Sequence, residues 1–260
     1  IYEREREHAI DGRSFERTEY SVRSGSNAFK QLLVRLGAPT GRKVASDFTA
    51  PDYLDRLADW QVALYLSAFF GAEMSAPEAL SAKNFYAPSV SHNRLVDERA
   101  AGEQFVRDLM RHLNGLGIRT NALEEVERTE TAAGETVRFR FGVSADPGNL
   151  LSFLTRVGYR YNREKQERAA LVARYLKRKE RVIEERARIA EEARALADGG
   201  TATAEVKRQF DGVNDRFVER SLYEEREGRP RPPVDFPDFE EFCERTTVRD
   251  DLTIETEIES

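Results

Sequence analysis

The chain has 260 residues, of which 40% are apolar and 34% charged, so it can bury the core of one large domain or two smaller ones. Its single cysteine, Cys243, excludes an internal disulfide and disfavours a cysteine zinc site, and we expect a reducing, cytoplasmic location. No apolar run approaches the length of a membrane span, which argues against a membrane partner. The N-terminus has neither a signal-peptide layout nor an initiator methionine, so we expect an excised piece of a longer protein.

The charge balance is acidic and dominated by arginine. A net charge of −6 argues mildly against nucleic acid as a partner, because a basic excess is the usual signature of such proteins. Arginine outnumbers lysine by 34 to 7, beside 47 acidic residues, which is typical of haloarchaeal proteins. An acidic surface that keeps a protein hydrated in salt would mask a local basic site. Ordinary surface solubility and a GC-rich genome explain the same composition equally well.

Hydrophobic periodicity predicts the elements of the first 160 residues. A weak alternation over residues 1–24 indicates a strand pair with its turn at Asp11-Gly12. The following segments then predict, in order, a helix at 27–36 capped by Ser26, a short helix at 51–57, a strongly apolar helix at 60–71, strands near 84–90, a helix at 100–113, a hairpin over 123–143 and a helix at 149–158. This order of helices and strands predicts an α+β unit.

The residues that follow are predicted to be mainly helical. Residues 163–198 predict a long charged helix or helix pair, with an apolar stripe that repeats every seven residues from Tyr175 to Leu196. Two short helices around a turn at Asp211–Asn214 have the layout of a helix-turn-helix. We therefore expect five parts, at residues 1–48, 49–162, 163–198, 199–245 and an acidic, frayed tail at 246–260.

The helix that ends at Glu73 has the most unusual composition in the chain. Four small residues, Ser67, Ala68, Gly71 and Ala72, would let the backbone of a second helix approach closely. Glu73 would project from the end of this helix. A plain buried helix followed by an acid explains the same residues. The three histidines stand far apart, and the sequence contains no glycine-rich phosphate loop.

The segment from Leu66 to Glu73 resembles the LAGLIDADG motif of the DOD-type homing endonucleases carried by inteins. Two later motifs resemble the same family repeat: Gln104–Leu113 followed by Gly115-Leu116-Gly117-Ile118, and Leu150–Arg156 followed by Val157-Gly158-Tyr159. The resemblance implies an ααββαββα-like repeat with a saddle-shaped sheet at 49–162. It also implies that 1–48 closes a first repeat whose motif lies upstream of Ile1. Met74 departs from the family's glycine, which puts the turn after the motif in doubt.

The resemblance implies a site-specific endonuclease that hydrolyses double-stranded DNA with Mg²⁺, with Glu73 as catalytic residue and metal ligand. It further implies a haloarchaeal intein, with a tRNA-splicing RNA ligase as the expected host protein. Six residues are expected to contact DNA: Arg208, Asn214, Arg216 and Arg220 of the helix-turn-helix, and Arg160 and Arg163 before the long helix. The alternatives are a remnant that binds DNA without cutting it and a non-enzymatic helix-turn-helix regulator.

Overall fold

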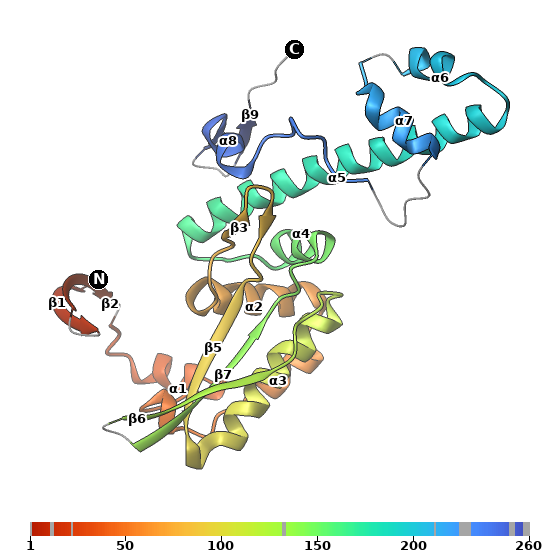
Figure 1. Cartoon of the computed structure of the whole chain (residues 1–260). Helices are drawn as coiled ribbons and strands as arrows, with labels where there is room; N and C mark the ends of the chain where they lie inside the picture. The colour runs from red at the N-terminus through yellow and green to blue at the C-terminus, as the bar shows by residue number, and fades with distance from the viewer. Residues whose placement is uncertain are drawn as a thin grey trace.

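The computed structural model describes residues 2–10, 13–21, 23–131, 134–210, 212–223, 230–249 and 253–256. The fold mixes helices with small antiparallel sheets around one main apolar core, and a long helix leads away from that core (Figure 1). None of the helices in these ranges is both long and apolar enough to cross a membrane.

The N-terminal segment forms a hairpin and a short helix. Strands β1 (Tyr2–Ile10) and β2 (Arg13–Ser21) pair in antiparallel register, as the alternation predicts, whereas the expected turn residues Asp11 and Gly12 lie outside the described ranges. Helix α1 (Asn27–Arg35) begins where the Ser26 hydroxyl accepts a hydrogen bond from the Phe29 amide, at 3.2 Å. Two 3₁₀ helices follow, η1 (Lys43–Ala45) and η2 (Asp52–Arg56), so the helix expected at 51–57 is a tighter turn.

Residues 59–156 form the α+β unit. Its elements are α2 (Asp59–Glu73), β3 (Ala79–Ser81), β4 (Asn84–Phe85), β5 (Ser89–Leu95), η3 (Val96–Glu98), α3 (Arg99–Gly115), β6 (Glu124–Thr131), β7 (Gly134–Gly142) and α4 (Pro147–Arg156). The main sheet is antiparallel with strand order β5-β7-β6, while β3 and β4 form a separate hairpin. The strands expected at 84–90 thus belong to two different sheets.

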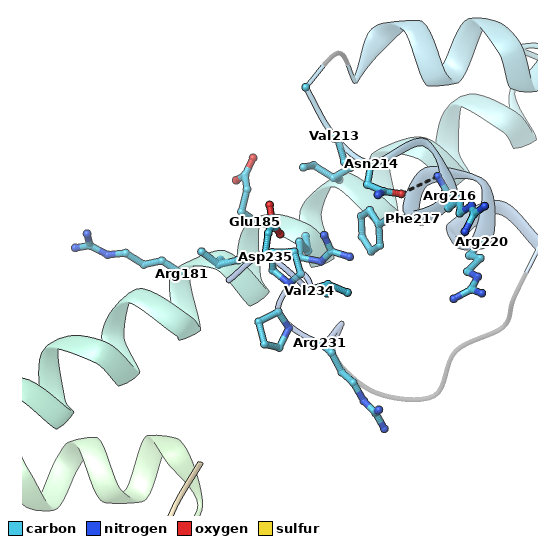
Figure 2. Close-up of a pocket in the computed structure, with 16 residues that line it drawn as sticks. Arg181, Glu185, Val213, Asn214, Arg216, Phe217, Arg220, Arg231, Val234 and Asp235 are labelled. Carbon is cyan, nitrogen blue, oxygen red and sulfur yellow. Dashed lines mark hydrogen bonds between the residues drawn. The ribbon is translucent and has the colours of Figure 1, made fainter. Parts of the chain in front are cut away.

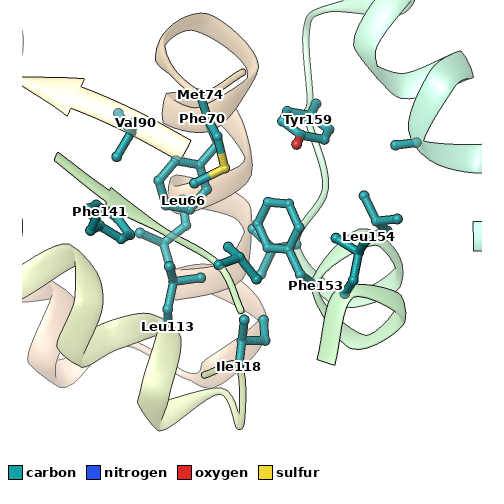
Figure 3. Packing of buried hydrophobic residues seen from close by; sticks show 14 of the residues in the cluster. Leu66, Phe70, Met74, Val90, Leu113, Ile118, Phe141, Phe153, Leu154 and Tyr159 are labelled. Carbon is teal, nitrogen blue, oxygen red and sulfur yellow. The ribbon is translucent and has the colours of Figure 1, made fainter. Parts of the chain in front are cut away.

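The sheet has one apolar face and one polar face. Val137, Phe139 and Phe141 alternate along β7 and are buried against the helices, and their side chains join those of α2, α3 and α4 in the core (Figure 3). The residues between them, Arg138 and Arg140, lie opposite polar positions of β5 on the other face. This second face is open to solvent at Arg140 and half-buried at Arg138.

The small residues of α2 contact this chain's own backbone. The Arg160 amide donates to both the carbonyl and the hydroxyl oxygen of Ser67, at 3.1 and 2.9 Å. A Cβ atom on Gly71 would lie 2.1 Å from the Arg160 carbonyl oxygen, so only glycine permits this approach. Ser67 and Gly71 therefore pack on the Arg160 backbone, while the contact with a second helix stays a prediction. Ala68 is half-buried and Ala72 is exposed.

A single helix of 36 residues, α5 (Arg163–Asp198), confirms the expected long helix and is about 54 Å long at 1.5 Å per residue. Its N-terminal half packs on the main core through Ala169, Val172, Tyr175 and Leu176. Its C-terminal half carries α6 (Thr203–Gln209) and α7 (Asp215–Tyr223), which pack on it through two small apolar clusters. The two short helices expected at 199–223 are thus present.

The C-terminal segment returns along α5 toward the core (Figure 1). The Tyr175 hydroxyl donates to the Pro237 carbonyl at 3.0 Å, and the Phe239 amide donates to the Ala82 carbonyl at 2.8 Å. Helix α8 (Phe239–Glu244) and the paired strands β8 (Thr246–Val248) and β9 (Ile254–Thr256) follow. The tail expected to be frayed from residue 246 therefore contains paired strands in its described part.

The close approach at Gly71 gives a stability prediction. We expect Gly71→Ala to lower the free energy of unfolding by about 1–3 kcal/mol, because the added methyl group must push the Arg160 backbone away. Gly115→Ala is the matched control, since a Cβ there meets no atom within 4 Å at the end of α3. Urea denaturation of both variants measures the effect. Equal midpoints for Gly71→Ala and the parent would contradict the packing described here.

Candidate functional site

A large cavity lies between the C-terminal half of α5, the start of α7 and the extended segment 231–235 (Figure 2). Its volume is about 1140 Å³. Five arginines line it against two carboxylates, those of Glu185 and Asp235. The arginines are Arg181, Arg186, Arg216, Arg220 and Arg231. We call this cavity the arginine groove.

Helix α7 is amphipathic, and two arginines of its exposed face line the groove. Phe217 and Val218 are buried in the two small clusters on α5, whereas Arg216 and Arg220 are exposed and stand four residues apart on one face. The Asn214 side-chain oxygen accepts a hydrogen bond from the Arg216 amide at 3.0 Å, which fixes the start of the helix (Figure 2). The Arg186 guanidinium lies 3.7 Å from the centre of the Phe217 ring, so α5 and α7 are joined by a cation–π contact.

The groove carries an excess of positive charge in an acidic protein. Within the described ranges, no carboxylate lies within 4 Å of the guanidinium groups of Arg181, Arg216 or Arg231. Glu185, by contrast, is engaged by Arg188, whose guanidinium lowers the pKa of that carboxyl. Arginines elsewhere are commonly paired with acids, as in Arg107–Glu103 at 2.7 Å. Arg181, Arg216 and Arg231 therefore have no acidic partner among the described residues.

A second cavity, of about 460 Å³, lies between the α1–η1 segment, α2 and the edge strand β5. Aromatic side chains form much of its wall, namely Phe48, Tyr65, Phe69 and Phe105. Its polar lining comes from Lys43, Glu73, Ser91, His92 and Asn93. We call this cavity the Glu73 pocket.

Two ammonium groups stand close to Glu73. Its carboxylate pairs with the Lys43 ammonium at 3.1 Å, and both side chains are partly exposed. The Lys165 ammonium donates to the Gly71 and Met74 carbonyls at 3.1 and 2.6 Å, and burial lowers the pKa of Lys165 while Glu73 opposes that shift. Met74 itself has an extended backbone with φ −90°, so the turn after the helix does not require the glycine of the motif.

The surroundings of Glu73 do not fit the expected Mg²⁺ site. Hard cations bind several oxygen ligands at once, whereas Glu73 is a single carboxylate already neutralised by lysine. Among the described residues, no three His, Cys, Asp or Glu side chains are grouped closely enough to hold a metal ion. The metal-ligand role expected for Glu73 therefore lacks partners in this part of the chain.

The structure divides the six residues expected to bind nucleic acid into two sets. Asn214, Arg216 and Arg220 line the arginine groove together. The other three lie elsewhere: Arg208 pairs with Glu205 on α6, Arg163 pairs with Glu167, and Arg160 precedes α5. Sequence analysis missed Arg181, Arg186 and Arg231, because the first two stand on a charged helix interpreted as a packing face and the third lies in a linker.

His92 is a neutral group in the wall of the Glu73 pocket. Its pKa is lowered to about 3, mainly by burial and in addition by the nearby charges of Arg94 and Lys43. Its ring lies 4.8 Å from the Phe105 ring and 6.0 Å from the Phe48 ring, between centres. The Nε2 atom is buried and has no hydrogen-bond partner among the residues described.

Comparison with known proteins overturns the endonuclease interpretation. The chain is 29% identical to the tRNA-splicing ligase RtcB of Methanopyrus kandleri over 248 residues, which is 94% of this chain and 24% of that protein. It is 30% identical to the tRNA-splicing ligase RtcB of Pyrococcus furiosus, over 94% of this chain and 25% of that protein. The chain thus spans about a quarter of the length of these relatives. No protein-family model and no solved structure matches it.

A differently named protein contains a similar region. The chain is 26% identical to the replication factor C small subunit of Methanocaldococcus jannaschii, over 95% of this chain but only 13% of that protein. The matched region is therefore similar in proteins that carry two different names, and it makes up a minor part of each.

Several expectations are corrected by these relatives. Three relatives that match more than nine-tenths of the chain are named as tRNA-splicing ligases, so a LAGLIDADG endonuclease acting on double-stranded DNA is not supported. The cleavage-inactive remnant and the helix-turn-helix regulator are not supported either. A tRNA-splicing RNA ligase was the expected host protein. The relatives themselves carry the name tRNA-splicing ligase, and their names mention no intein. The small residues of the motif have another explanation, since Ser67 and Gly71 pack on Arg160.

The lowered pKa of His92 predicts how stability depends on pH. Between the ordinary value of 6.5 and about 3, the unfolded chain binds a proton that the folded chain does not, so stability falls as pH falls through this window. The limiting slope is about 1.4 kcal/mol per pH unit. We expect His92→Phe to flatten the curve of unfolding free energy between pH 6 and 4. Identical slopes for variant and parent would show that His92 ionises freely in the folded protein.

Proposed function

We propose that this chain is an RNA-binding region and that the arginine groove binds the phosphate backbone of a structured RNA. One observation carries the proposal: five arginines surround a single cavity, and three of them are exposed with no carboxylate within reach in the described structure. A local excess of guanidinium groups in a protein of net charge −6 favours an anionic partner at this place.

The chemistry of the groove suits a polyanion better than a single anion. Each guanidinium presents a planar fork of donors that matches phosphate oxygens in a two-pronged hydrogen bond. Arg216 and Arg220 stand one helical turn apart, with Cβ atoms about 5–6 Å from each other, so they can reach neighbouring phosphates of one strand. Arg181 on α5 and Arg231 on the extended segment also line the groove, and Figure 2 shows their side chains directed away from Arg216 and Arg220. Binding would release condensed counterions and would therefore depend on salt.

The relatives support RNA as the polyanion. Two of them are named for splicing tRNA, whose folded stems are A-form duplexes. Proteins recognise such duplexes mostly through shape, phosphates and 2′-hydroxyl groups. A similar region also occurs in a protein named for replication. Binding to a phosphate backbone is a property that both kinds of relative could use.

A double substitution tests the groove. We expect Arg216→Ala/Arg220→Ala to weaken binding of a tRNA transcript by at least tenfold, measured by fluorescence anisotropy. The slope of log affinity against log salt should flatten by about two, because each lost phosphate contact removes about one unit. The matched control is Arg107→Ala/Arg128→Ala, which removes two exposed, ion-paired arginines outside the groove.

Two outcomes would contradict the proposal. The first is an unchanged affinity and salt slope for the groove variant, with circular dichroism showing that it is folded. The second is binding to a DNA duplex with no detectable binding to tRNA or to an RNA hairpin.

A further inference from the structure

We propose that the Glu73 pocket holds one unpaired nucleobase of the RNA, so that the region recognises a bulged or looped-out nucleotide as well as the backbone. The inference rests on the proposed RNA-binding function and concerns a different cavity. It follows from three features of the pocket: its aromatic walls, its ion pair and a buried polar atom without a partner.

The walls suit a flat, apolar ring. Phe48, Phe69 and Phe105 line the cavity, and their rings meet edge to face, with centres 5.2 Å apart for Phe48–Phe105 and 5.7 Å for Phe69–Phe105. Unstacked bases of single-stranded RNA segments stack on such side chains, and every base offers a π face for this contact. A volume of about 460 Å³ falls within the range of small-molecule sites, about 300–1,000 Å³.

The ion pair suits the edge of a base. The Glu73 carboxylate accepts hydrogen bonds and the Lys43 ammonium donates them, and the two groups lie 3.1 Å apart in the same lining. The Watson–Crick edge of each RNA base places a donor next to an acceptor, so this pair can satisfy both at once. Partial exposure of both side chains keeps the pair within reach of an incoming base.

The pocket lining also contains one buried polar atom without a partner among the described residues. His92 Nε2 is buried without a hydrogen bond within the described structure, and leaving such an atom unsatisfied is unfavourable. The lowered pKa of His92 keeps the ring neutral, so it does not repel Lys43 or Arg94. Ser91 and Asn93, on either side of His92 in β5, add further hydrogen-bonding side chains to the same lining.

A buried arginine connects the segments that form the pocket wall. Arg94 is fully buried, and its guanidinium donates to the Lys43 and Phe48 carbonyls at 2.8 and 3.2 Å. The same guanidinium lies 3.8 Å from the centre of the Phe48 ring. The η1 segment and the Phe48 wall are thereby fixed to β5 before any ligand arrives, which lowers the entropy cost of binding.

The test compares two RNA hairpins that differ at one nucleotide. One carries a single bulged adenosine and the other an abasic residue at that position. The intact protein is expected to bind the first about 5- to 100-fold more tightly, the range expected for stacking of one base. Lys43→Ala/Glu73→Ala leaves the net charge and the aromatic walls unchanged, and it should reduce this ratio because the edge of the base loses its partners. The matched control, Glu103→Ala/Arg107→Ala, removes another ion pair outside the pocket and should keep the ratio.

A second measurement does not depend on RNA binding. Saturation-transfer NMR should detect adenosine and cytidine on the intact chain, but not ribose 5-phosphate, and the Lys43→Ala/Glu73→Ala variant should lose the nucleoside signal. The arginine-groove variant Arg216→Ala/Arg220→Ala should retain it. Nucleoside binding without tRNA binding would overturn the proposed function alone. Equal affinity for the two hairpins, or no nucleoside signal at millimolar concentration, would overturn the base pocket.

Discussion

The contact between α2 and the segment Tyr159–Asn162 holds the architecture together. The Arg160 amide donates to Ser67, and the side chains of Asn162 and Lys165 donate to the carbonyls at the end of α2. A helix end leaves carbonyl groups without partners, so these donors stabilise α2 where its own hydrogen bonds stop. Because α5 begins at Arg163, immediately after this contact, the direction of the long helix is fixed relative to the core.

The long helix α5 connects the main core to the arginine groove. Its N-terminal half is anchored in the main core, and its C-terminal half forms a wall of the arginine groove (Figure 1). The β3–β4 hairpin and the C-terminal segment support this arrangement, since the Lys179 ammonium donates to the Lys83 carbonyl at 2.6 Å and the Tyr175 hydroxyl donates to the Pro237 carbonyl. The groove therefore combines three segments that are distant in the sequence.

The sequence predicted most of the helices, because their apolar periodicity is set by burial of one face. It did not predict that Ser67 and Gly71 contact the loop at Arg160. Close backbone approach requires the same small side chains whether the neighbour is a helix or the loop at Arg160. The grouping of Arg216 and Arg220 followed from helical spacing alone. Their association with Arg181 and Arg231 depends on the folding back of segment 231–235, for which local sequence carries no signal.

The Glu73 pocket was only partly accessible to sequence reasoning. Glu73 stood out at the end of an apolar helix, but its pairing with Lys43 depends on how η1 docks on β5. That docking is set by Arg94, a buried arginine in a strand, which sequence patterns alone would assign to the surface. The sequence also did not indicate that a lysine faces Glu73, because the pairing depends on the fold.

Hydrogen–deuterium exchange with and without a tRNA transcript tests the central claim most directly. The account predicts slower amide exchange on RNA binding in α7 and in residues 230–235, the segments that form the arginine groove with α5. Peptides from the exposed hairpin β1–β2 should be unchanged. Protection confined to other segments, with α7 and 230–235 exchanging as in the free protein, would contradict the assignment of the groove as the RNA-binding surface.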